Sequence, residues 1–320
     1  MQAGSVQKAS FYVFLGMLCI SINDLFVKQF SKNYPLHEII FIRSLIAILF
    51  TLLLVKSEGG LKILKTQQPI QHALRAVAIF LCNMIFFSAI ATLPLATATA
   101  LFFVAPIFIT LLSIPLLGEK VGIRRLLAVI TGFLGVFIMM KPNTWSMSDI
   151  PPFIYFLPVI AAVLYALMQI MTRKLSKSSK PAALAFYIQL AFMVFSLIFG
   201  LIFGDGKLAD VSSNTSLQFI LKGWTFPKTS DLPYFFALGF LAAGVSYFMS
   251  KAYSTAAAAS VAPFEYVLLP LSIFWGWTFF GDIPDLYILT GIIFVVGSGL
   301  YVLIREKKKE IPSSSFPNKS

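Results

Sequence analysis

The residues that could do chemistry in this sequence are polar and ionisable side chains placed inside long apolar runs. Asn23 and Asp24 lie in the first run, Arg43 in the second, and Glu265 in a later run between two prolines. Charges near the centre of a bilayer are costly, so such residues usually bind a substrate, an ion or one another. The predicted substrate-binding residues are Asp24, Asn23, Arg43, Asn83, Gln169, Tyr253, Glu265 and Tyr266.

Each of the three charged residues has a functional and a structural interpretation. A buried carboxylate at Glu265 requires a cation, a proton or a set of hydrogen-bond donors, and the alternative is a purely structural ion pair. Asp24 is predicted to contact substrate or a proton, with an ion pair to Arg43 or Lys28 as the alternative. Arg43 is best interpreted as a guanidinium that bridges helices, with anion recognition second.

The composition places the elements around these residues in lipid. Hydrophobic residues make up 58% of the 320 residues and charged residues only 12%, and the mean hydropathy is +0.86. The net charge of +12 comes from short loops and the C-terminus, which is typical of topology signals and argues against nucleic-acid binding. Two cysteines and two isolated histidines predict neither a disulfide framework nor a metal site, and no cofactor is expected.

Apolar runs of about 20 residues predict transmembrane helices. No small-residue cleavage site follows the first run, so we interpret it as a retained helix. Ten spans are predicted, at 11–30, 36–55, 73–92, 97–117, 124–140, 153–173, 182–203, 233–252, 257–280 and 286–304. With the N-terminus inside, 18 Lys and Arg residues fall in cytoplasmic segments and 6 in outside segments. This asymmetry predicts that both termini are cytoplasmic.

Two segments outside the spans are interpreted as solvated chain. The stretch 205–232 is polar and falls outside, where Asn214-Thr215-Ser216 matches a glycosylation sequon. The basic tail 305–320 is predicted to be disordered and to hold the last helix end in the cytoplasm.

The two halves of the chain resemble each other. A shift of 163 residues places Gly118-Glu119 on Gly281-Asp282, and a shift of 145 places Ser31-Lys32 on Ser176-Lys177. The sequence therefore predicts two five-helix units, 11–140 and 153–304. Because five is odd, the second unit enters the membrane from the opposite side, and inverted repeats of this kind place a binding site at the bilayer midplane.

Prolines mark the fourth and ninth spans. Pro106 and Pro115 are predicted to interrupt the fourth span, and Pro263 and Pro270 the ninth. Carbonyl groups freed at membrane depth are tolerated where they are buried in protein or line a cavity. The alternative interpretation is a pair of packing kinks with no role in ligand binding.

Particular motifs resemble a known family. The pair Gly118-Glu119 and Gly281-Asp282, together with 262–266 (Ala-Pro-Phe-Glu-Tyr), resembles the EamA branch of the drug/metabolite transporter superfamily. Ile22-Asn23-Asp24 with Lys28, and Phe41-Ile42-Arg43, are similar to bacterial members that include S-adenosylmethionine uptake transporters. The resemblance covers about 11–305 and implies ten helices, cytoplasmic termini and a central cavity between the halves.

The predicted function is secondary transport of a small polar metabolite across the inner membrane by alternating access. For S-adenosylmethionine, the sulfonium and ammonium groups would contact Asp24 or Glu265, the adenine an aromatic shelf, and the carboxylate Arg43. The alternatives are amino-acid or drug export and riboflavin uptake. An integral membrane enzyme or a scaffold is a further alternative, and the sequence has no ATP-binding loop. The expected partners are the metabolite and the lipid bilayer, with the chain a monomer or a homodimer.

Overall fold

The computed structural model describes residues 3–118, 123–140, 150–207, 209 and 215–310. Within these ranges the secondary structure is helical, and no strand occurs. Seven helical segments are long and apolar enough to cross a membrane, and two shorter apolar stretches lie at Ile130–Met139 and Leu286–Ser298. The prediction of an all-helical multi-pass membrane protein is therefore confirmed for the part of the chain described.

The long helices follow the predicted apolar runs. The first part of the chain forms α1 (Ala3–Phe30), α2 (Leu36–Glu58), α3 (Pro69–Ile90), α4 (Leu95–Phe102), α5 (Ala105–Leu117) and α6 (Ile123–Met139). The second part forms α7 (Phe153–Leu175), α8 (Pro181–Phe203), α9 (Thr215–Leu221), α10 (Leu232–Thr255), α11 (Ala258–Val261), α12 (Leu268–Trp275) and α13 (Leu286–Glu310). A 3₁₀ helix, η4 (Ala262–Val267), joins α11 to α12, and a π-helical turn, η5 (Gly276–Phe280), follows α12.

Proline and glycine set several of these boundaries. Pro69 and Pro181 occupy the first positions of α3 and α8, where the missing N–H group is not needed by the helix. Gly118 and Gly281 end α5 and η5 with φ of 70° and 68°. A side chain with a Cβ rarely adopts this left-handed conformation, so glycine stops both helices at little cost.

The two helical segments with paired prolines are broken, as the sequence predicts, and of the four prolines only Pro115 lies away from the start of a helical element. Pro106 lies in the first turn of α5, just after α4 ends, and Pro263 lies at the start of η4. Pro115 lies inside α5 without ending it, and Pro270 lies in the first turn of α12. The first turn of a helix tolerates proline because its N–H groups have no intrahelical partner there.

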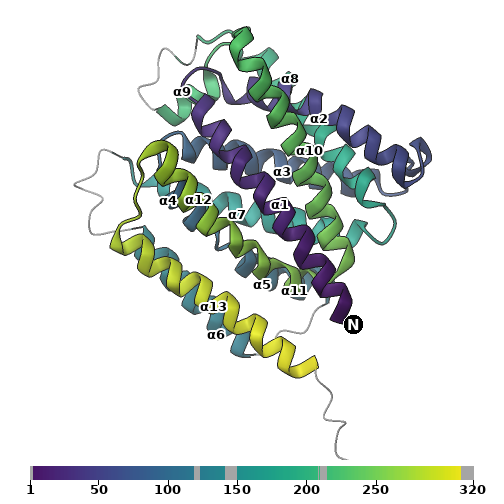
Figure 1. Ribbon diagram of the computed structural model, residues 1–320, viewed down its shortest axis with the longest axis vertical. Helices are drawn as coiled ribbons and strands as arrows, with labels where there is room; N and C mark the ends of the chain where they lie inside the picture. Colours follow the sequence, from purple (N-terminus) through teal and green to yellow (C-terminus); the bar gives the residue numbers. More distant parts are fainter. Residues whose placement is uncertain (1–2, 119–122, 141–149, 208, 210–214, 311–320) are drawn as a thin grey trace, which may run out of the picture.

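The helices pack in a small number of extensive pairs. α1 packs along α10, α3 along α7, α2 along α8, and α6 along α13. Figure 1 shows α6 and α13 side by side at the edge of the bundle, while α1 crosses its centre beside α10. The described ends of the chain, the start of α1 and the end of α13, point toward the same end of the bundle (Figure 1).

Large apolar side chains cover the outer faces of the helices. Leu49 and Leu53 of α2, Phe137 of α6 and Leu201 of α8 are all exposed. In water such surface would be costly, so these faces are suited to contact with lipid.

The structure corrects two expectations about segments outside the apolar runs. Helix α13 continues to Glu310, so 305–310 is helical rather than disordered, while 311–320 lies outside the described residues. The stretch 205–232 is more than a solvated connector. It contains α9, whose Phe219 is buried, and Lys222 donates hydrogen bonds to the carbonyl groups of Lys32 and Asn33 between α1 and α2. The sequon residue Asn214 lies outside the described residues.

Candidate functional site

A central cavity lies between the helices and encloses about 960 Å³ of unfilled space, including the part that opens to solvent. Its wall combines apolar side chains with polar groups from several helices, as in small-molecule binding sites. The polar or ionisable side chains on the wall are Asn23, Asp24, Arg43, Arg75, Asn83, Tyr165, Gln169, Gln189, Ser246, Ser250 and Glu265. Six of the eight predicted site residues therefore line one cavity.

Arg43 joins three helices at the cavity wall. Its Nη1 donates a hydrogen bond of 2.9 Å to Oδ1 of Asn23 on α1, and its Nη2 donates one of 2.8 Å to Oδ1 of Asn83 on α3. The guanidinium also lies 5.4 Å from the ring centroids of Phe87 and Phe192. Both terminal nitrogens are therefore held by the protein, which supports the interpretation of Arg43 as a helix bridge.

Asp24 is buried beside this bridge without a cation in ion-pair contact. The Nδ2 group of Asn23 donates a hydrogen bond of 3.2 Å to Oδ1 of Asp24. Neither of the cations considered as its partner forms an ion pair with it within the described part of the chain. Lys28 instead lies 3.7 Å from Asp282 and donates a hydrogen bond of 2.7 Å to the carbonyl group of Leu93.

Glu265 lies in η4, where the broken helical segment carries its side chain to the cavity. The side chain is 2% exposed, and its Oε1 accepts hydrogen bonds of 3.1 Å from the hydroxyl group of Tyr165 and 2.5 Å from that of Tyr253. Gln169 in turn donates a hydrogen bond of 2.6 Å to the Tyr165 hydroxyl group. Oε2 of Glu265 makes no hydrogen bond to a described residue, so it is available to a ligand.

Two predicted site residues do not line the cavity. Tyr253 is fully buried and acts on the site through its hydrogen bond to Glu265. Tyr266 packs its ring 5.6 Å from that of Phe103, and its buried hydroxyl group has no hydrogen-bond partner within the described part of the chain.

Sequence reasoning missed several cavity residues. Arg75 is 1% exposed and lines the cavity, although its position next to a loop suggested the end of a span. Gln189, Ser246 and Ser250 also line it, and Gln189 donates hydrogen bonds of 2.9 Å to the carbonyl group of Ala242 and to Ser246. Gln189 was detectable from sequence, because a glutamine stands out in an uncharged span.

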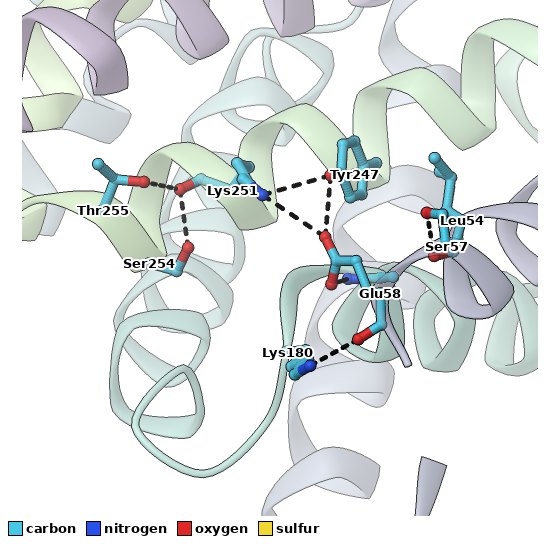
Figure 2. Close-up of polar contacts among 9 residues, drawn as sticks. Leu54, Ser57, Glu58, Lys180, Tyr247, Lys251, Ser254 and Thr255 are labelled. Carbon is cyan, nitrogen blue, oxygen red and sulfur yellow. Dashed lines mark hydrogen bonds and ion pairs between the residues drawn. The ribbon is translucent and has the colours of Figure 1, made fainter. Parts of the chain in front are cut away.

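A separate polar cluster joins the end of α2 to α8 and α10 outside the cavity wall. Figure 2 shows Glu58 accepting a hydrogen bond of 2.9 Å from Tyr247 and lying 3.5 Å from the ammonium group of Lys251. The carbonyl group of Glu58 accepts a hydrogen bond of 2.5 Å from Lys180. Lys251 is therefore engaged at the end of the bundle and does not contribute to the cavity.

The fold and site define a class: a multi-pass helical membrane protein with a polar cavity enclosed between its helices. The profile of the EamA-like transporter family matches residues 7–141. The chain is also 30% identical over 264 residues to the riboflavin transporter of Rhizobium johnstonii, covering 82% of this chain and 80% of that one. The chain belongs to the EamA-like transporter family.

Other relatives support the same assignment across both halves. The S-adenosylmethionine uptake transporter of Rickettsia prowazekii is 26% identical over 294 residues, which is 92% of each chain. A solved crystal structure superposes with a TM-score of 0.69 at 16% identity, covering 95% of this chain and 99% of that one, and it supports the fold alone. The family and these relatives are transporters rather than enzymes, so the chain is a membrane metabolite transporter by its family.

Proposed function

We propose that this protein is a secondary transporter that takes up S-adenosylmethionine, or a close zwitterionic relative, across the inner membrane by alternating access. The observation that carries the proposal is the presence of Asp24, Arg43, Arg75 and Glu265 on the wall of one cavity. Buried charges of both signs that are not paired with each other are expensive unless a ligand compensates them.

The charges of this cavity suit S-adenosylmethionine better than riboflavin. S-adenosylmethionine carries a sulfonium, an ammonium and a carboxylate group, and so it can compensate acidic and basic residues at once. The flavin ring of riboflavin is uncharged at neutral pH and would leave them unpaired. Oε2 of Glu265 and the carboxylate of Asp24 are the groups we assign to the cationic part of the substrate, and aromatic rings such as Phe86 and Phe102 to its adenine.

Riboflavin uptake is the second candidate, because a relative named for riboflavin is 30% identical to this chain. A largely aromatic and aliphatic wall, with Phe86, Phe102 and Phe103 among its residues, is compatible with a flavin ring. Export of amino acids or drugs is a further alternative from the sequence.

We further propose that the fold consists of ten spans in two inverted five-helix repeats, 11–140 and 153–304. The ends of the helices support this. A shift of 145 residues carries the bounds of α2, Leu36–Glu58, onto those of α8, Pro181–Phe203. A shift of 163 residues carries the first residues of α3, α4 and α6 onto those of α10, α11 and α13. The same shift carries Gly118 onto Gly281, and both have left-handed φ.

The pairs of helices that pack together are consistent with this internal repeat. In the proposed repeat α1 corresponds to α7 and α3 to α10, so the pair α1–α10 corresponds to the pair α7–α3, which is also an extensive contact. The pairs α2–α8 and α6–α13 each join two corresponding helices. Alternating access then corresponds to rocking of α1–α10 and α3–α7 around the cavity between them. The positive-inside asymmetry of the sequence supports cytoplasmic termini.

Ligand-induced stabilisation of the purified protein tests the substrate class. A ligand that binds the native state raises its apparent stability by mass action. We expect S-adenosylmethionine to raise the melting temperature, and Glu265→Gln to abolish or strongly reduce the shift. A panel in which riboflavin alone stabilises the protein would support the second candidate. A panel in which neither compound acts would contradict both.

A further inference from the structure

We infer that Arg75 binds the carboxylate group of the transported substrate, and that the substrate therefore carries an α-amino-acid end. This inference rests on the proposed function, of which it names a further binding residue. Arg43 was the expected carboxylate partner from sequence, and the geometry of the two guanidinium groups favours Arg75.

Arg75 is held at the cavity wall by neutral groups from three other helices. Its Nε donates a hydrogen bond of 2.7 Å to Oγ1 of Thr172 on α7, and its Nη1 donates one of 3.0 Å to the carbonyl group of Leu184 on α8. Its Nη2 lies 3.4 Å from Oγ of Ser250 on α10, which is a long hydrogen bond. These contacts fix the direction of the guanidinium without neutralising its charge.

No carboxylate forms an ion pair with Arg75 among the residues that the structure describes. A guanidinium has five N–H groups, and three of them are used by these hydrogen bonds. One N–H group therefore remains on each terminal nitrogen, and a carboxylate can accept hydrogen bonds from two N–H groups of one guanidinium. A buried cation with free donors on a cavity wall is suited to an anionic group of the ligand.

The terminal nitrogens of Arg43 are held more firmly than those of Arg75. Both of its terminal nitrogens donate to amide oxygens, those of Asn23 and Asn83, at 2.9 and 2.8 Å. Its guanidinium carbon lies over the rings of Phe87 and Phe192, 5.4 Å from each ring centroid. Arg43 also keeps one N–H group on each terminal nitrogen, and its buried Nε has no partner within the described residues. The difference is that its two contacts are short, whereas the contact of Arg75 Nη2 with Ser250 is 3.4 Å long and is easily given up to a carboxylate.

The ammonium group of an α-amino acid needs an acceptor close to its carboxylate. Ser246 lies one turn of α10 before Ser250, and it accepts a hydrogen bond from Gln189. Oε1 of Gln189 is buried and has no hydrogen-bond partner within the described ranges. We assign this oxygen as the acceptor for the ammonium group, because a buried acceptor without a partner costs free energy until a donor reaches it.

Helix α7 sets the distance from this subsite to Glu265. Tyr165, Gln169 and Thr172 lie on one face of α7 at helical spacing; Tyr165 contacts Glu265, and Thr172 contacts Arg75. Seven residues of α-helix rise about 10 Å. The substrate is therefore elongated, with its carboxylate at Arg75 and a cationic or N–H donor group near Glu265. S-adenosylmethionine meets both conditions.

The test compares uptake of S-adenosylmethionine with uptake of its decarboxylated analogue into proteoliposomes containing the full chain. We expect the wild-type protein to take up S-adenosylmethionine with an apparent affinity about 10- to 100-fold higher, the range typical of a charge-assisted hydrogen-bond pair. Arg75→Gln should remove this preference, because it should lower the apparent affinity for S-adenosylmethionine and leave that for the decarboxylated analogue unchanged. Arg75→Lys keeps the charge but loses the paired geometry, so it should retain a reduced preference for S-adenosylmethionine over the analogue. This variant also keeps the test decisive if the Arg75→Gln protein does not fold. Arg43→Gln is the matched control and should weaken both compounds equally.

The outcomes separate this inference from the proposed function. A wild-type protein that transports both compounds without preference, or Arg75 variants that weaken both compounds equally, would overturn the assignment of Arg75 while leaving the transport function intact. A wild-type protein that takes up riboflavin and neither of the two compounds would overturn the substrate class and the subsite together.

Discussion

The hydroxyl group of Tyr253 on α10 donates a hydrogen bond of 2.5 Å to Oε1 of Glu265 in η4. Tyr165 on α7 donates a second hydrogen bond to the same oxygen. Glu265 is thus held on one side by two helices, while its other oxygen is left to the cavity. This arrangement positions a carboxylate for a ligand without pairing it with a cation of the protein.

The first prediction concerns this positioning. Tyr253→Phe removes one donor, so the Glu265 side chain loses its fixed direction, and the apparent affinity for substrate should fall about tenfold, as expected for one hydrogen bond to a charged group. Concentration-dependent uptake in proteoliposomes measures this. Tyr266→Phe is the matched control, because its hydroxyl group has no partner within the described residues, and it should transport like the wild type. Equal losses in both variants would contradict the positioning role of Tyr253.

The second prediction concerns the ion pair between Lys28 and Asp282, whose side chains are 14% and 26% exposed. This pair joins the end of α1 to the segment between η5 and α13, and we expect it to hold the bundle closed at the end that the charge asymmetry places outside. Cys82 lines the cavity. In a variant in which Cys19 is replaced by alanine, the rate at which Cys82 is labelled therefore measures how often the cavity opens. Lys28→Met should speed labelling of Cys82 by an external, membrane-impermeant thiol reagent about two- to fivefold, since partly exposed ion pairs contribute up to about 1 kcal/mol.

Two further variants make this test specific. Lys32→Met is the control, because the Lys32 side chain makes no ion pair to a described residue, and it should leave labelling unchanged. Exchanging the charges, with Lys28→Asp and Asp282→Lys together, should restore part of the closure. Labelling that is indifferent to all of these changes would argue against closure by this pair.

The third prediction concerns the contact between α6 and α13. A Cβ atom added at Gly291 would lie 2.6 Å from the carbonyl oxygen of Gly135 and 2.2 Å from Cγ of Met139, whereas one added at Gly297 would meet nothing within 4 Å. Gly291→Ala should therefore destabilise the protein by about 1–3 kcal/mol through overpacking. Gly297→Ala, the same change on the same helix, should be neutral or slightly stabilising. Thermal unfolding in detergent compares the two, and equal melting temperatures would contradict the close packing.

The fourth prediction concerns pH and the segment that follows α9. The hydroxyl group of Tyr34 donates a hydrogen bond of 2.6 Å to Asp231 and accepts one of 3.0 Å from the backbone N–H of Lys228. Burial and then the hydrogen bond to Asp231 raise the pKa of Tyr34 above its ordinary value. Because the pKa of Tyr34 is higher in the folded protein than in the unfolded chain, its protonated hydroxyl group contributes its full stabilisation below about pH 10, the pKa in the unfolded chain. This contribution is lost as the pH rises further.

The melting temperature of the wild type should therefore fall more steeply above pH 10 than that of Tyr34→Phe, which lacks the titrating group. Tyr234→Phe provides the control, because the Tyr234 hydroxyl group makes no hydrogen bond to a described residue, and it should keep the wild-type pH dependence. A parallel decline in wild type and Tyr34→Phe would show that Tyr34 does not contribute.

Much of the fold was predictable from sequence, because apolar length and proline positions are local signals. The predicted gap between the spans 73–92 and 97–117 lies close to the end of α3 at Ile90 and the start of α4 at Leu95, and the predicted span ends at 117 and 280 coincide with the ends of α5 and η5. The polar side chains inside apolar runs were equally visible, and Asp24, Arg43, Asn83, Gln169 and Glu265 do converge on one cavity.

The role of Arg75 was not predictable in the same way. The polar residues before it were interpreted as loop, and the span was placed from residue 73. Helix α3 instead begins at Pro69, so Arg75 lies two turns inside the bundle, where α7, α8 and α10 surround it. The partners of Lys28 and Glu265 likewise depend on contacts between helices far apart in sequence, which periodicity does not reveal.

The decisive experiment for the proposed transport function is uptake of radiolabelled S-adenosylmethionine into proteoliposomes that contain the full chain. We expect saturable uptake above that of protein-free liposomes, competed by unlabelled S-adenosylmethionine and strongly reduced by Glu265→Gln. Uptake no greater than that of empty liposomes, for correctly folded protein in both orientations, would contradict it.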